Sequence, residues 1–273
     1  MTDISFEFFP PKTIIAAFSL QRAAQTLSMF EPNFGSVTCS HNPAQTLDTL
    51  AALDKLALGP FQAHITCASQ HNNQLPQYLR AAKRAGAKGI VALRGDGKSQ
   101  GLSVCQLIQS AQKQEYNQIF VAAYPEVHPM AQNAQSDLDM LLRKQDAGAS
   151  AAITQFFFDA DHFLKFRDQA AAHGITMPLI PGILPVQNWP KTQSMTQACG
   201  TSVAPDLAEG FERAAREGRS ELMAIAHATE LCDKLIQNGV GQLHFYTMNH
   251  AEVVASICTA IGKAPQQSLR QVA

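Results

Sequence analysis

The sequence predicts a single-domain (β/α)8 TIM barrel, an α/β fold in which eight parallel strands alternate with helices. Short runs rich in β-branched and aromatic residues recur eight times, and Ala-, Leu- and Gln-rich segments with helical spacing lie between most of them. Several of these segments stop at a glycine directly before the next run, as in AGAKG, AGAS and AHGI. No linker, repeat or shift in composition marks a boundary within the 273 residues, so we expect one domain over residues 1–273.

The first predicted strand is ISFEFF, residues 4–9, in which alternate positions share a face and the following Pro10–Pro11 ends the ladder. The other predicted strands are 34–38, 62–67, 89–94, 118–124, 152–158, 177–184 and 242–247. The predicted helices between them include 44–57, 74–86, 102–114, 134–147 and 160–173. The interval between the seventh and eighth strands is longer, and we expect two or three extra helices there. A doubly wound open sheet is the alternative, and the count of eight strands favours the barrel.

Composition excludes several classes of partner. A formal net charge of -1 gives no reason to expect nucleic acid or an anionic membrane surface. No stretch reaches the roughly 18 apolar residues of a membrane span, and the opening MTDISFEF does not resemble a signal peptide. The six cysteines are scattered without a CxxC pair, so we expect reduced thiols in a cytoplasmic protein.

Polar residues gather at the carboxyl ends of the predicted strands, the face on which barrel enzymes place their active sites. They are Glu7, Thr38, His64 with Thr66, Arg94-Gly95-Asp96, the run Tyr124 to His128, Gln155, and Tyr246 with Asn249. Taken singly, each has a structural explanation: His64 could be a satisfied core histidine, and Arg94 with Asp96 a surface ion pair. The convergence of seven strand ends on one rim favours an active site.

Glu7 is the most informative of these residues. A carboxylate on so apolar a strand must face water or a polar cavity, because burying an unpaired charge is costly. One reading is an edge strand with Glu7 in solvent. The other directs Glu7 into the barrel mouth while Ile4, Phe6 and Phe8 pack under the helices, and the barrel favours this second reading.

Three familiar motifs are absent. The segment ALRGDGKS (92–99) ends like a P-loop, but Ala92 stands at its first glycine position and no helix start follows directly. The spacings of Cys39, His41, His64 and Cys67 match no standard zinc pattern, so we expect no metal. No GxGxxG follows a strand, so the sequence does not distinguish NADH from NADPH.

Six ordered segments carry a resemblance to a known family: SFEFFPPKT, VALRGD, VAAYPEVHP, DAGASAAITQFFFD, IPGILPV and HFYTMN. From Ser5 to about Gly262 the chain resembles the methylenetetrahydrofolate reductases, in their short bacterial form of a single catalytic barrel. The resemblance implies non-covalent FAD, hydride uptake from NADH or NADPH, and ping-pong reduction of 5,10-methylenetetrahydrofolate to 5-methyltetrahydrofolate. It also implies a homo-oligomer that serves one-carbon metabolism and methionine supply.

The resemblance further assigns roles by motif position. Glu7 corresponds to the general acid that activates the folate, and Asp96 to the residue beside flavin and pterin. Gln155, Lys191 and His250 correspond to substrate-binding positions. The FAD positions are Thr38, His64, Arg94, Gly95, Asp96, Tyr124, His128, Ala131, Asp137, Arg143 and Lys144. Cations such as Arg143 and Lys144 suit a pyrophosphate.

The chain also departs from the family pattern. His250 stands where an arginine is expected and Lys191 where a glutamine is usual, while Cys39, His41 and Met140 differ near the flavin positions. Two other functions therefore stay open: a folate-dependent barrel enzyme such as a methyltransferase or demethylase without hydride chemistry, and a non-catalytic folate- or flavin-binding protein.

Overall fold

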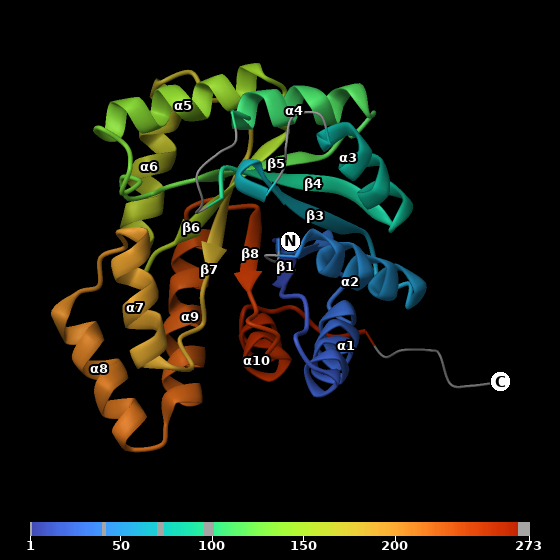
Figure 1. The fold of residues 1–273 in the computed structure, drawn as a ribbon. Helices are drawn as coiled ribbons and strands as arrows, with labels where there is room; N and C mark the ends of the chain where they lie inside the picture. Colours follow the sequence, from blue (N-terminus) through green and yellow to red (C-terminus); the bar gives the residue numbers. More distant parts are fainter. Residues whose placement is uncertain (1, 40–41, 70–73, 96–100, 267–273) are drawn as a thin grey trace.

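The computed structural model describes residues 2–39, 42–69, 74–95 and 101–266, and its strands form a closed, all-parallel barrel in the order β1 to β8 (Figure 1). The strands are β1 (Asp3–Phe8), β2 (Phe34–Val37), β3 (Phe61–Thr66), β4 (Ala87–Leu93), β5 (Ile119–Ala123), β6 (Ala151–Phe156), β7 (Leu179–Ile183) and β8 (Gln242–Tyr246). The predicted fold is therefore confirmed, and each predicted strand agrees with an observed one to within two residues at either end.

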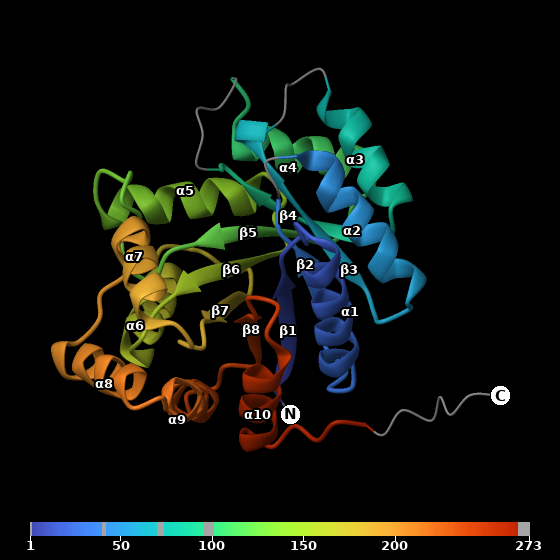
Figure 2. The same cartoon turned by 60° about the horizontal axis from the view of Figure 1, so that its bottom comes forward.

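Helices surround the barrel. They are α1 (Ile14–Ser28), α2 (Pro43–Lys55), α3 (Leu75–Arg84), α4 (Val104–Lys113), α5 (Ala134–Asp146), α6 (Ala160–Ala172), α7 (Trp189–Cys199), α8 (Pro205–Arg216), α9 (Ser220–Gln237) and α10 (Ala251–Ala260), with a short 3-10 turn at Cys67–Ser69. The long interval between β7 and β8 holds α7, α8 and α9, as expected, and these lie together on one side of the barrel (Figures 1 and 2). The sequence did not single out α1 and α10, which pack side by side across the seam between β1 and β8.

Side-chain caps set where several helices begin. Thr13 accepts a hydrogen bond from Ala16 N at the start of α1, and Ser103 forms a capping box with Gln106 at the start of α4. Asn188 accepts from Lys191 N at the start of α7. Each cap stands shortly after the carboxyl end of a strand, so the caps also direct the chain from the barrel rim back along its outside.

The apolar residues form an outer and an inner core. Outward-facing strand residues such as Ile4, Phe6 and Phe8 pack in one large buried cluster with the inner faces of the helices. Inside the barrel, a smaller cluster of Phe34, Val91, Phe120, Ala151, Ile153 and Ile180 fills the end toward the strand starts. Most polar inward-facing residues, such as Glu7 and Tyr246, lie nearer the strands' carboxyl ends, whereas Gln62 is buried near the start of β3 and donates to Gln118. No helix in the described part of the chain is long and apolar enough to cross a bilayer.

Candidate active site

Glu7 lies near the carboxyl end of β1 and faces the barrel interior. In the ladder it stands opposite Ser36 of β2 and Tyr246 of β8, while its neighbours Phe6 and Phe8 face the helices. Only 7% of Glu7 is exposed. The structure thus confirms that the glutamate points into the barrel and excludes a solvated edge strand, since the barrel is closed.

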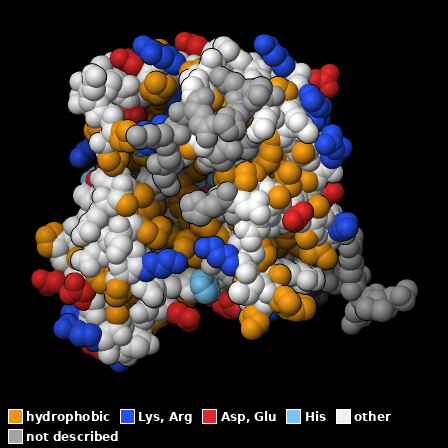
Figure 3. All heavy atoms as spheres, viewed as in Figure 1, with side chains coloured by type: hydrophobic (Ala, Val, Ile, Leu, Met, Phe, Trp, Pro, Cys, Tyr) orange, Lys and Arg blue, Asp and Glu red, His pale blue; other side chains and the backbone are white. Residues whose placement is uncertain are grey.

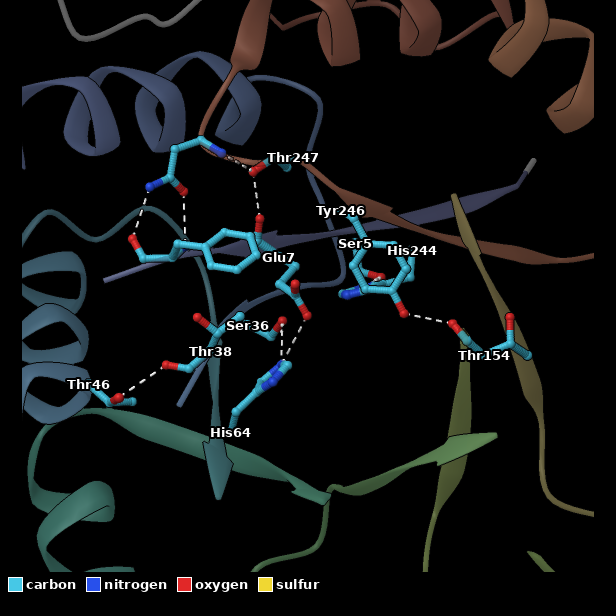
Figure 4. A network of polar contacts seen from close by, with 12 residues as sticks. Ser5, Glu7, Ser36, Thr38, Thr46, His64, Thr154, His244, Tyr246 and Thr247 are labelled. Atoms are coloured by element: carbon cyan, nitrogen blue, oxygen red, sulfur yellow. Dashed lines mark hydrogen bonds and ion pairs between the residues drawn. The ribbon is translucent and has the colours of Figure 1, made fainter. Parts of the chain in front are cut away.

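Glu7, His64 and Ser36 form a polar group inside the mouth (Figure 4). The Nε2 atom of His64 lies 3.1 Å from Ser36 Oγ and 3.5 Å from Glu7 Oε2. Burial raises the pKa of Glu7 to about 8 and lowers the pKa of His64 to about 3. At neutral pH both groups are therefore uncharged, and we regard their proximity as a contact of neutral groups rather than an ion pair.

One layer deeper, Ser5 and His244 pair across the β1–β8 seam. Ser5 Oγ lies 2.8 Å from His244 Nδ1, and the imidazole stacks on Phe34. Burial lowers the pKa of His244 to about 3, and its Nε2 has no hydrogen-bond partner among the described residues. Neither residue was predicted from the sequence as part of the site, although Ser5 lies two positions before Glu7 and His244 two before Tyr246, on the same inward faces.

Tyr246 closes the other side of the site. Its hydroxyl donates to the carbonyl oxygen of Thr154 at 2.6 Å, and burial raises its pKa well above the usual value. Gly182 allows this close approach, since a Cβ at that position would overlap Thr154 O and the Tyr246 ring. The tyrosine is held as a neutral hydrogen-bond donor that joins β8 to β6.

Gln155 stands near the end of β6, half-buried. Its side-chain Nε2 donates to Cys199 Sγ at 3.2 Å, and its Oε1 accepts from the backbone N–H of Phe156 at 3.0 Å. These two contacts fix the orientation of the amide and attach it to the end of α7. The structure therefore places Gln155 on the same rim as Glu7, as expected.

The predicted flavin residues of β2 and β4 also reach this rim. Thr38 follows β2, and its carbonyl accepts a hydrogen bond from Thr46 Oγ1 at 3.0 Å (Figure 4). Arg94 follows β4 with its guanidinium exposed beside Met130 Sδ, 2.7 Å away. Gly95 has a φ of +81°, where a side chain would be strained.

The segment after β5 contributes the next group. Tyr124 meets His128 edge-to-face with ring centroids 4.4 Å apart, and His128 Nδ1 accepts from Met130 N at 3.0 Å. The proton of a neutral His128 is then on Nε2, which is a hydrogen-bond donor. Asp137 accepts from His128 N at 3.0 Å, and Ala131 N donates to His128 O at 2.8 Å, so the turn is well defined.

Two cations follow on α5 and differ in their surroundings. Lys144 is buried, donates to Ala122 O at 2.7 Å, and has its pKa lowered by that burial, whereas Arg143 is exposed. These side chains fit a cofactor that carries a pyrophosphate and an aromatic ring. The exposed guanidinium groups of Arg94 and Arg143 can bind the phosphates, and the half-buried ring of Tyr124 can pack against the ring. Lys144 retains two N–H groups beyond its bond to β5.

Two of the predicted substrate residues, Lys191 and His250, lie in the segments that follow the neighbouring strands β7 and β8. Lys191 is exposed in the first turn of α7, after β7, and His250 is exposed directly before α10, after β8. His250 lines a cavity of about 550 Å³ between α1 and α10 together with Thr13 and Arg22. On the face seen in Figure 3, hydrophobic side chains line a central hollow and basic side chains lie close to its edge.

Some predicted positions cannot be placed. Asp96 and His41 lie outside the described residues, so the role of Asp96 stays a prediction.

Two other positions that depart from the family pattern are placed. Cys39 Sγ lies 3.8 Å from Thr66 Oγ1, and Met140 is 41% exposed. Within the described part of the chain no three His, Cys, Asp or Glu side chains gather as a metal site would require.

Comparison with known proteins gives the family. The family model "Methylenetetrahydrofolate reductase" matches residues 1–262. The 5,10-methylenetetrahydrofolate reductases of Pectobacterium carotovorum subsp. carotovorum and Escherichia coli (strain K12) are each 36% identical to the chain; the alignments cover 96% of it and 91% and 92% of these relatives.

A solved structure agrees in fold. The uncharacterized protein from Clostridium thermocellum that binds two copies of 5-methyl-5,6,7,8-tetrahydrofolic acid superposes with a TM-score of 0.64 at 14% identity, covering 95% of this chain and 94% of that one. At that identity the likeness concerns the barrel alone. The extent of the family match and the identity to the bacterial enzymes show that the chain belongs to the methylenetetrahydrofolate reductase family.

Proposed function

We propose that this chain is a FAD-dependent reductase that takes hydride from NADH or NADPH and converts 5,10-methylenetetrahydrofolate to 5-methyltetrahydrofolate. The observation that carries the proposal is Glu7: a buried carboxyl group at the barrel mouth, with a pKa raised to about 8, in a chain of this family. Such a group still holds its proton at neutral pH, which is what a general acid requires.

The acid has a defined task in this chemistry. Reduction of the methylene bridge requires the five-membered ring of the folate to open to an iminium, and the departing N10 amine must be protonated. Glu7 would deliver that proton from inside the mouth. The low dielectric around it and the absence of a nearby charged histidine keep the carboxyl group protonated until substrate arrives.

Bound FAD would supply the hydride-transfer chemistry that no amino-acid side chain offers. The residues that would hold it are Thr38, His64, Arg94, Gly95, Asp96, Tyr124, His128, Ala131, Asp137, Arg143 and Lys144. Arg94 and Arg143 would meet its phosphates, and Tyr124 would pack against one of its ring systems. The other side chains would orient it over the mouth, beside Glu7.

The substrate would reach Glu7 across the rim formed by β6, β7 and β8. Gln155 would contact the folate and the nicotinamide in turn, with its amide oriented by the contacts to Cys199 and Phe156. Lys191 and His250 would meet the carboxylates of the folate tail. Lys191 would provide the permanent cation of this pair.

The decisive experiment combines a spectrum with two half-reactions. Purified protein should show the absorbance bands of oxidised flavin near roughly 380 and 450 nm. Anaerobic stopped-flow should show bleaching by NADH or NADPH, and recovery of colour on adding methylenetetrahydrofolate. A protein that stays colourless after FAD is added would contradict the proposal and favour a folate-dependent enzyme without hydride chemistry. Comparison of the two bleaching rates would identify the nicotinamide donor.

Two broader properties complete the proposal. We expect a reducing, cytoplasmic setting, on the basis of six cysteines scattered along the sequence without a CxxC pair. We also expect a homo-oligomer, which light scattering of the purified protein would test.

A further inference from the structure

The backbone of β1 continues past the point where its ladder with β8 ends. The last register pair between these strands is Glu7 with Tyr246. After Tyr246 the segment that follows β8 turns away from β1. In this turn Met248 and Asn249 have φ of +51° and +61°. Phe9 has therefore lost its strand neighbour on the β8 side, and the residues that follow it are Pro10 and Pro11.

The direction of the free backbone groups follows from strand geometry. In a strand between two parallel neighbours, successive residues direct their N–H and C=O groups to opposite sides. Phe8 O faces β2 and accepts from Thr38 N at 2.9 Å. The carbonyl of Glu7 and both backbone groups of Phe9 consequently face the side on which β8 has ended.

The side chains of Thr247, labelled in Figure 4, and of Asn249 take the place of the missing strand. Thr247 Oγ1 donates to Glu7 O at 2.5 Å and accepts from Asn249 N at 3.0 Å. The amide of Asn249 accepts from Phe9 N through Oδ1 and donates to Phe9 O through Nδ2, both at 2.9 Å. We call these four hydrogen bonds the side-chain ladder.

The residue types suit this arrangement closely. A carboxamide presents one acceptor and one donor side by side, as a peptide group does, whereas an aspartate would set a carboxylate oxygen against Phe9 O. Asparagine also tolerates the left-handed backbone that Asn249 adopts. A threonine hydroxyl can donate and accept at once, as Thr247 does here.

We propose that Thr247 and Asn249 are positioning residues for the acid: their ladder fixes the backbone of residues 7 and 9 and thereby keeps the Glu7 carboxyl beside Ser36 and His64. The inference rests on the proposed function of Glu7 and goes beyond it, since neither residue belongs to the acid or to the predicted cofactor and substrate positions. The ladder joins residues 240 positions apart, at the seam where the first and last strands meet.

The consequence for catalysis concerns one step only. Misplacement of a reacting group by about 1 Å can cost roughly a hundredfold in rate. Loss of the ladder should therefore slow reoxidation of the reduced enzyme by methylenetetrahydrofolate, which needs the acid. Flavin reduction by NAD(P)H needs no proton from Glu7 and should be nearly unaffected.

The main test uses Thr247→Val, which keeps the shape of the side chain and removes its hydroxyl. We expect folate-dependent reoxidation to fall at least about tenfold through kcat, with flavin reduction within about threefold of the wild type. Thr247→Ser restores the hydroxyl and should restore the rate. Thr49→Val is the matched control, because Thr49 is a buried threonine whose hydroxyl donates to Gln45 O within α2, away from the site.

A second variant keeps the test open should Thr247→Val fail to fold. Asn249→Gly removes both bonds to Phe9 and accepts the left-handed backbone without strain. It should show the same split between the half-reactions and at least about tenfold faster hydrogen exchange at the Phe9 amide. Folded variants that keep the wild-type reoxidation rate would overturn the proposal. It would also be overturned if the variants slowed both half-reactions equally and the control Thr49→Val slowed them by the same factor.

The exchange measurement also separates this inference from the proposed function. If the wild-type protein shows no reoxidation by methylenetetrahydrofolate, the proposed function fails regardless of the ladder. If the wild type is active but the Phe9 amide exchanges equally fast with and without Asn249, the ladder does not fix the backbone and the positioning role is wrong.

Discussion

His64 Nε2 lies 3.5 Å from Glu7 Oε2 in a site where both side chains are more than nine-tenths buried. An ion pair at this distance would require a charged histidine and a charged carboxylate. Burial acts in the opposite direction on both, because it lowers the pKa of His64 to about 3 and raises that of Glu7 to about 8. Burial therefore keeps the proton on Glu7, and its contact with His64 is one between neutral groups.

The first prediction concerns stability against pH. The folded-state pKa of Glu7 is about 8 and its ordinary value 4.5. Between these two values the unfolded chain releases the proton and the folded protein keeps it, so the contribution of Glu7 to stability falls as pH rises from about 4.5 to 8. The free energy of unfolding should then decline relative to Glu7→Gln by a few kcal/mol at most, on the order of 1.4 per pH unit.

Denaturant titrations of both proteins at several pH values would measure this difference. His64 and His244 act in the other direction: their lowered pKa values destabilise the fold as pH falls below 6.5. They are present in both proteins, so their effect cancels in the comparison. A difference that does not change with pH would show that Glu7 is charged in the folded state.

The second prediction concerns the folate tail. His250→Arg should lower the KM for methylenetetrahydrofolate with little change in kcat, because a permanent cation adds binding that is equal in ground and transition states. Lys191→Gln should raise KM in the same assay if that lysine supplies the existing cation. Steady-state kinetics at fixed NAD(P)H would measure both. An unchanged or higher KM for His250→Arg would place the tail elsewhere.

The third prediction concerns Gly182, where β7 passes close to Tyr246. Gly182→Ala would drive a methyl group into Thr154 O and the tyrosine ring, so the strands must separate. We expect destabilisation of at least about 3 kcal/mol in chemical unfolding. Gly210→Ala is the control. Gly210 lies within helix α8, and a Cβ there would meet only the flexible end of Met223 from α9, so the change should be neutral or stabilising by roughly 0.5–1 kcal/mol.

The sequence allowed the strands and the orientation of Glu7 to be predicted because both follow from local rules. Parallel barrel strands are short apolar runs. The period of two places the side chain of Glu7 on one face of β1 and those of Phe6 and Phe8 on the other face. The clustering of strand-end residues on one rim follows from the barrel topology. These features require no knowledge of which side chains meet.

The parts that could not be predicted all depend on pairs far apart in the chain. Ser5 meets His244, and Gln155 meets Cys199, through contacts that no periodicity reveals. Thr247 appears in the sequence as an ordinary strand-end threonine, and only the closure of β8 onto β1 brings its hydroxyl to Glu7. The raised pKa of Glu7 likewise depends on burial by neighbours from other strands.

The last prediction tests the acid itself. Glu7→Gln removes the proton donor while keeping the shape of the side chain. If Glu7 protonates the departing amine of the folate, it is needed only in the second half-reaction. The variant should still bind FAD, and NAD(P)H should bleach it within about tenfold of the wild-type rate. Reoxidation by methylenetetrahydrofolate should fall by at least the roughly 10²–10⁴-fold that a lost general acid costs.

The same variant should be neutral or stabilised in thermal unfolding, because an uncharged amide avoids the cost of burying an ionisable group between three strands. This outcome separates the two readings of the glutamate. Unfolding of Glu7→Gln, or loss of its flavin, would make Glu7 a structural residue. Survival of both half-reactions would mean that the proton comes from another group. The proposed role of Glu7 as the acid requires one combination of results. The Glu7→Gln variant must be stable, hold its flavin and accept hydride, yet fail to reduce the folate.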